Sequence, residues 1–197
     1  MNKALLGVWL VLPLGAWAYH EGPGQDQMSL DTVDQLVAEA HDAALAEEWA
    51  EAVEKYDQAL LELPSDRVGT ARQIRLELNK ARMLSAKLPA AHADLASLVQ
   101  EMLQDESADQ GLLDQARSTL ANSQYYLTWL MRLEGLPREK WEPEIEAARQ
   151  TYRLIAERAQ AQGDAEAVAK ATEDLESAIR LARMELTELQ GLPLPNQ

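Results

Sequence analysis

Apolar positions recur every three to four residues along most of this chain, which is the period of an α-helix with one buried face. The exception is residues 120–133 (LANSQYYLTWLMRL), where apolar side chains spread around most of the helix circumference. A helix that is apolar on nearly every side must be covered by neighbours on more than one side. We therefore expect this segment to be the centre of the fold, with helices that each have one apolar face packed against it.

Proline, glycine and capping residues divide the pattern into about seven expected helices. The first begins at Ser29 or Asp31, the next two cover about residues 48–63 and 67–86, and the last is one long helix that ends at Gly191. Ser107 with Gln110 is expected to form a capping box, Asp164 is a second expected N-cap, and residues 137–143 are expected to be irregular. No alternating strand pattern occurs, and short turns favour antiparallel neighbours. The expected fold is therefore all-α, built from stacked helix hairpins.

The first 18 residues have the layout of a secretory signal peptide. A short basic start precedes an apolar stretch at residues 4–15, and Ala16-Trp17-Ala18 supplies a small-x-small cleavage signal. This predicts an exported, periplasmic or secreted protein with no membrane span after cleavage; the alternative is a retained N-terminal anchor or a buried helix. Beyond it we expect a flexible lead at 19–29, one helical domain at 30–190 and a frayed tail at 191–197.

Composition narrows the partners and the chemistry. The formal net charge is −15, so binding to nucleic acid or to anionic lipid is not expected. The acidic residues are dispersed along helix faces, as on a solvated surface. Without cysteine the chain has no disulfide, thiolate metal site or thiol nucleophile.

A search for catalytic, cofactor-binding and metal-ligating motifs finds none with useful spacing. The three histidines, at 20, 41 and 92, lie in unrelated contexts, and no glycine-rich phosphate loop or Gly-x-Ser-x-Gly motif occurs. We therefore predict no cofactor, no metal and no enzymatic activity. A hydrolase that uses only carboxylates, or an acidic cation-binding protein, stays open as an alternative at this point.

One segment carries a repeat signature. Within residues 31–64, small, aromatic and proline positions follow a regular spacing: Leu36, Ala40, Ala43, Trp49, Ala52, Tyr56, Ala59 and Pro64. This spacing resembles the tetratricopeptide repeat, in which small residues let two helices cross closely. The segment departs from that family at Glu39, where an apolar residue is usual, and at Glu47, where a turn glycine is usual. Degenerate copies are expected near residues 78–98 and 120–159; the alternative is a generic helical bundle.

The resemblance implies a right-handed superhelix with a concave groove that binds a protein or peptide. The first helix of each pair would line the groove, with Asp34, Val37 and His41 from the first unit, Gln73, Leu76 and Lys80 from the second, and Asn122, Tyr125, Trp129 and Arg132 from the third. Trp129 is favoured as a core residue, Tyr125 fits either surrounding, and Arg132 is expected to offer its donors to the partner. The implied function is an exported scaffold or adaptor for another envelope protein. The sequence leaves the partner and the oligomeric state undefined.

Overall fold

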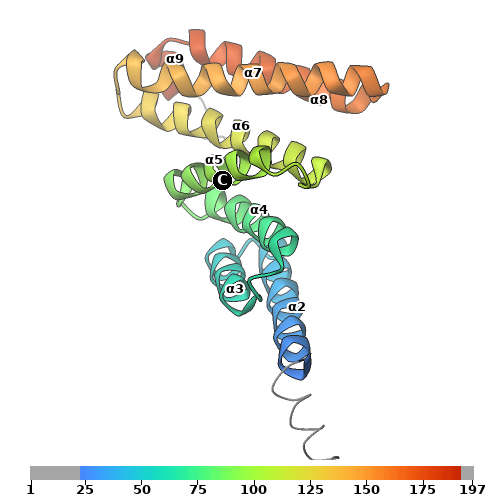
Figure 1. Ribbon diagram of the computed structural model, residues 1–197. Helices are drawn as coiled ribbons and strands as arrows, with labels where there is room; N and C mark the ends of the chain where they lie inside the picture. Colours follow the sequence, from blue (N-terminus) through green and yellow to red (C-terminus); the bar gives the residue numbers. More distant parts are fainter. Residues whose placement is uncertain (1–22, 192–197) are drawn as a thin grey trace, which may run out of the picture. The chain divides into compact units, whose positions relative to one another are not determined.

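The computed structural model describes residues 23–191, with side chains from residue 28 onward (Figure 1). In this range the chain forms eight helices and no strand, which confirms the all-α prediction. The helices are α2 (Pro23–Leu45), α3 (Trp49–Glu62), α4 (Val68–Leu84), α5 (Leu88–Gln104), α6 (Gln110–Leu133), α7 (Arg138–Gln162), α8 (Ala165–Arg183) and α9 (Leu186–Gln190). The predicted signal segment at 1–18 lies outside the described residues. None of the helices between 23 and 191 is long and apolar enough to cross a membrane.

The chain divides into two compact units, residues 1–74 and 75–197, and the boundary falls within α4. In the first unit, α2 and α3 form an antiparallel hairpin. Three alanines are completely buried in it, Ala40 of α2 and Ala52 and Ala59 of α3, and Tyr56 is 4 % exposed. Small side chains at these positions let the two helix backbones approach closely, as the repeat spacing predicts.

Both departures from the tetratricopeptide pattern have a structural counterpart in this hairpin. Glu47, in the turn, adopts φ 60°, the left-handed conformation that favours glycine. The Glu48 N–H donates to the carbonyl of Ala43 at 2.9 Å, which closes α2 in the usual left-handed manner. Glu39 accepts a hydrogen bond of 2.6 Å from Lys55 Nζ of α3, so its carboxylate bridges the two helices.

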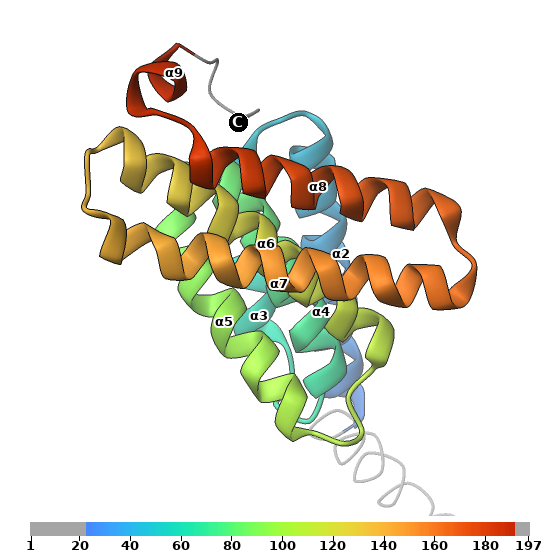
Figure 2. The ribbon, with the colours of Figure 1, turned by 90° about the horizontal axis from the view of Figure 1, so that it is seen from above.

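The second unit has two apolar clusters that share α6. One cluster joins α4 and α5 to the first half of α6, with Leu76, Leu95 and Leu113 among its buried residues. The other joins the second half of α6, including Trp129, to α7, α8 and α9. Figure 2 shows α7 and α8 running antiparallel, with α9 turning at the end of α8. The expectation that the central helix is covered on more than one side is confirmed.

A polar network links α4 to α5 beside the first cluster. Asp94 accepts hydrogen bonds of 2.6 Å from both the Arg75 guanidinium and the fully buried Asn79 amide. Arg75 also pairs with Glu101 at 2.8 Å. Burial would raise the pKa of Asp94, but the hydrogen bonds from Arg75 and Asn79 outweigh it and hold that pKa below its ordinary value.

Two predicted helix starts are wrong. In the described residues, α2 is already helical at Pro23, ahead of Ser29 and Asp31, so the part of the predicted flexible lead from Pro23 to Ser29 is helical. Ser29 does not cap it, because its hydroxyl donates to the Glu62 carbonyl at the end of α3. At α6 the N-cap is Asp109, which accepts from the Leu112 N–H at 2.6 Å. Ser107 instead donates twice to Asp105, through its N–H and its hydroxyl.

Two other predictions fail further along. Residues 138–143 belong to α7 rather than to an irregular segment, although Pro143 lacks the N–H that would continue the helix ladder. Trp141 and Ile145, on either side of it, are both buried in the core cluster, so packing outweighs that loss. The predicted long last helix is two helices, because Met184 and Glu185 adopt extended backbone between α8 and α9. Asp164 does cap α8, accepting from the Ala167 N–H at 3.0 Å.

Candidate functional site

The predicted groove positions are divided between the two units. In the first unit, Asp34, His41 and Gln73 are exposed and Val37 is half-buried. In the second unit, Leu76 is completely buried in the α4–α6 cluster, so it cannot line a groove. Lys80 is half-buried and pairs with Glu77 one turn earlier, at 2.8 Å.

Helix α6 brings together the remaining positions. Asn122 accepts a hydrogen bond of 2.8 Å from the buried Tyr152 hydroxyl of α7, so it fixes α6 to α7. Trp129 is 6 % exposed and belongs to the core, as favoured from the sequence. Tyr125 is half-buried, and its ring contacts Tyr126 edge-on at 5.5 Å and Trp129 at 6.2 Å.

We call Tyr125 and Tyr126 of α6, together with Asp174 of α8, the tyrosine face. Burial raises the pKa of both phenols, and the nearby carboxylate of Asp174 adds to the effect. The pKa of Asp174 is itself raised, mainly by burial, with Lys170 opposing and Glu173 adding. Among residues 28–191, Asp174 has no hydrogen bond or ion pair. The face therefore combines half-exposed aromatic rings with an unpaired acid.

Arg132 has a different role from the one that the sequence suggested. Its two terminal amino groups donate to the carbonyls of Leu181 and Met184, at the end of α8. Its guanidinium also stacks over the Trp141 ring, 4.8 Å from the centroid. The last carbonyls of a helix have no partner within that helix, so Arg132 caps α8 from another helix. The expectation that Arg132 offers its donors to a binding partner is therefore wrong.

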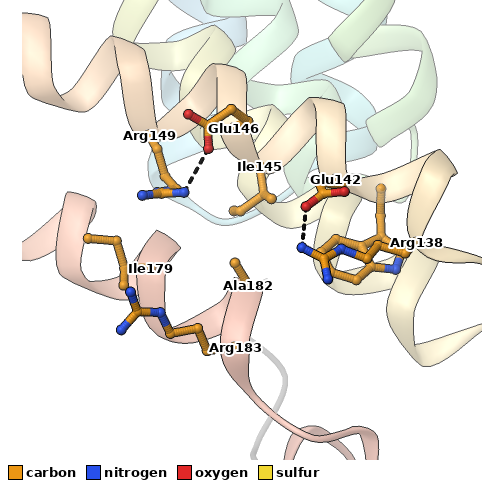
Figure 3. Close-up of a pocket in the computed structure, with 9 residues that line it drawn as sticks. Arg138, Glu142, Ile145, Glu146, Arg149, Ile179, Ala182 and Arg183 are labelled. Carbon is orange, nitrogen blue, oxygen red and sulfur yellow. Dashed lines mark hydrogen bonds and ion pairs between the residues drawn. The ribbon is translucent and has the colours of Figure 1, made fainter.

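A cavity of about 150 Å³ lies between α7 and α8 (Figure 3). Its apolar surface comes from Trp141 and Ile145 of α7 and from Ile179 and Ala182 of α8, and its rim carries Arg138, Glu142, Glu146, Arg149 and Arg183. Figure 3 shows Arg149 and Arg183 at one end of the cavity and Arg138 at the other. We call this cavity the α7–α8 pocket. None of its residues was a candidate from the sequence, because each one fits either an ordinary exposed position or the apolar face of a helix.

Three helices also bring together a serine, a histidine and a glutamate. His92 of α5 lies 3.2 Å from Ser123 Oγ of α6 through Nδ1, and its Nε2 lies 3.6 Å from Glu144 of α7. Ser123 is completely buried, and its hydroxyl already donates to the Leu120 carbonyl at 2.7 Å. A serine nucleophile needs an accessible oxygen and a proton that the histidine can accept. This arrangement supplies neither, and we assign it to holding α5, α6 and α7 together.

The acidic side chains were the remaining candidates for a metal site. Within the described residues, no set of three or more His, Asp and Glu side chains is placed to hold a metal ion. In the α7–α8 pocket, Glu142 and Glu146 are each paired with an arginine. Comparison with protein-family models and with curated proteins finds no match to this chain.

Proposed function

We propose that this protein is an exported scaffold, similar to tetratricopeptide proteins, that holds a segment of another envelope protein. Export rests on the signal-peptide pattern of residues 1–18. The repeat relationship is supported by the α2–α3 hairpin, where Ala40, Ala52 and Ala59 are completely buried at the expected positions. The right-handed superhelix of such repeats is part of the proposal.

The tyrosine face is the observation that carries the binding function. Tyr125 and Tyr126 present half-exposed rings on the helix that the repeat pattern assigns to the groove. Tyrosine is enriched where protein partners bind, because one ring supplies both apolar contact and a hydrogen-bonding hydroxyl. Trp129 contacts the Tyr125 ring from the core, and Arg132 binds the end of α8, so we treat both as structural residues rather than as partner contacts.

Site-specific photo-crosslinking in the native organism tests this function. A photoreactive phenylalanine analogue replaces Tyr126 in one strain and the exposed Gln160 of α7 in a control strain. We expect a discrete crosslinked envelope protein at position 126 and none at position 160. Equal crosslinking at both positions, or none at position 126, would contradict a groove on the tyrosine face.

A further inference from the structure

We propose that the α7–α8 pocket binds a carboxylate that carries a short aliphatic group. This site is separate from the tyrosine face, and the proposal does not depend on the groove function. It rests on three properties of the pocket, namely its size, the charge balance of its rim and a buried donor without an acceptor.

Size limits the ligand to one small group. A volume of about 150 Å³ is close to that of an engineered apolar cavity that binds benzene. Typical cofactor and drug pockets begin at about 300 Å³. The floor, formed by side chains such as Ile145, Ile179 and Ala182, suits a branched aliphatic group of the size of a leucine side chain.

The rim has one arginine without a charge partner. Arg138 pairs with Glu142, and Arg149 pairs with Glu146 at 2.7 Å, so these two pairs are neutral. Arg183 is exposed and forms no ion pair within residues 28–191. The pocket therefore carries one uncompensated positive charge, although the protein has a net charge of −15. A monocarboxylate balances that charge, whereas a phosphate dianion would exceed it.

Arg149, which lines the pocket, has a buried donor without an acceptor in the part of the chain that the structure describes. Its Nε is buried and has no hydrogen-bond partner among the described residues, while its terminal amino group is bound to Glu146. An unsatisfied buried donor costs about 1–3 kcal/mol. A carboxylate has two acceptor oxygens, so it can accept two hydrogen bonds from the exposed Arg183 guanidinium.

Calorimetric titration of the full chain with three probes tests this assignment. Isovalerate and N-acetyl-leucine both have a carboxylate on an aliphatic group, and N-acetyl-leucinamide has the same group without the charge. We expect the two acids to bind and the amide to bind at least about ten-fold more weakly, which is the contribution of one charge-assisted hydrogen bond. Tighter binding of isovalerate would indicate a free small carboxylate as the ligand. Tighter binding of N-acetyl-leucine would indicate the C-terminal residue of a peptide.

Matched variants locate the binding. Arg183→Gln is expected to weaken the acids at least about ten-fold, whereas Arg153→Gln, an equal charge change at an exposed position of α7 outside the pocket, leaves binding unchanged. Ala182→Leu fills the floor and should abolish binding, with retained helicity checked by circular dichroism. Equal affinity for acid and amide, equal loss in both arginine variants, or no binding by either acid would overturn the proposal. Replacing Tyr126 should not affect this titration, so the pocket and the tyrosine face can fail separately.

Discussion

The hairpin of the first unit and the last four helices of the second are stabilised in different ways. In α2 and α3, small side chains meet at the crossing, and the turn closes through backbone bonds between residues close in sequence. In α6 to α9, large aromatic residues fill the core, and Arg132 joins α6 to the end of α8, 49 and 52 residues away. The α2–α3 hairpin follows from the spacing of small residues within a short stretch of sequence. The packing of α6 to α9 depends on contacts between residues that are far apart in the sequence.

The largest expected effect tests the hydrogen bonds that join Arg132 of α6 to the end of α8. Arg132→Ala removes two charge-assisted hydrogen bonds and the stacking on Trp141, and it leaves the last carbonyls of α8 without their cap. We expect the free energy of unfolding to fall by about 2–4 kcal/mol, measured by urea denaturation. Arg153→Ala, on the exposed surface of α7, is the control and should change it by less than about 0.5 kcal/mol. Equal effects would show that Arg132 does not hold the two helices together.

The crossing in the first unit should be slightly less sensitive. Ala52→Leu adds three carbon atoms at the helix crossing, where Ala52 is 0 % exposed. We expect a loss of about 1–3 kcal/mol in the same measurement. Ala50→Leu, at an exposed position of the same helix, should be nearly neutral. An unchanged denaturation midpoint for Ala52→Leu would remove the best evidence for the repeat.

Two aspartates of the second unit should respond to pH with opposite sign. The folded pKa of Asp94 lies below its ordinary value of 3.8, so its stabilisation is present above that pH and is lost as the pH falls through the folded value. We expect Asp94→Asn to cost about 1–2 kcal/mol at pH 7, and the difference from the native protein to shrink below about pH 4. Denaturation curves recorded from pH 3 to pH 7 measure both quantities.

Asp174 provides the contrast, because its folded pKa is raised from 3.8. A raised carboxyl pKa means that the charged form is disfavoured in the fold, so this group lowers stability once the pH exceeds its ordinary value. Asp174→Asn is therefore expected to be neutral or stabilising at pH 7 in the same experiment. A loss as large as that of Asp94→Asn would show that Asp174 has a partner in solution.

The smallest expected effect is shared by both units. Glu47 and Ala86 adopt φ 60° and 58°, in the turns after α2 and α4. The left-handed conformation costs a side chain about 1–2 kcal/mol, and the extra flexibility of glycine offsets part of the gain. We expect Glu47→Gly and Ala86→Gly each to stabilise by about 0.5 kcal/mol. Glu48→Gly, at φ −84°, should destabilise, and stabilisation by all three would attribute the effect to something other than the turn.

Local signals predicted most of the fold. Asp164 was identified as a cap, and Gly163 ends α7 at φ 74°, as its position before that cap suggests. The break at Met184 was missed because no proline or glycine marks it, and the residue that caps α8 there lies on another helix. The cap at Asp109 was missed because Ser107 also matches a capping pattern, and only the structure shows its hydroxyl bound to Asp105.

The candidate site was less accessible from the sequence than the fold. Tyr125 was identified from the groove register, but its neighbour Asp174 lies on α8, and no spacing rule connects the two. Arg183 could not be identified from the sequence either. It is the uncompensated charge of the pocket because Arg138 and Arg149 are paired with acids of their own helix. Both pairs lie within α7 at spacings of three and four residues, which the sequence does show, but the meeting of these side chains with Arg183 of α8 in one pocket depends on how the two helices pack.

Helix α6 belongs to two apolar clusters, and this affects how the second unit unfolds locally. Leu113 and Ala116 pack with α4 and α5, whereas Ala121 and Trp129 pack with α7, α8 and α9. Neither cluster can separate completely without exposing part of the same helix, so the two are coupled through its backbone. The amides of α6 should then exchange with solvent more slowly than those of any other helix in the unit, because they open only in the least frequent fluctuation.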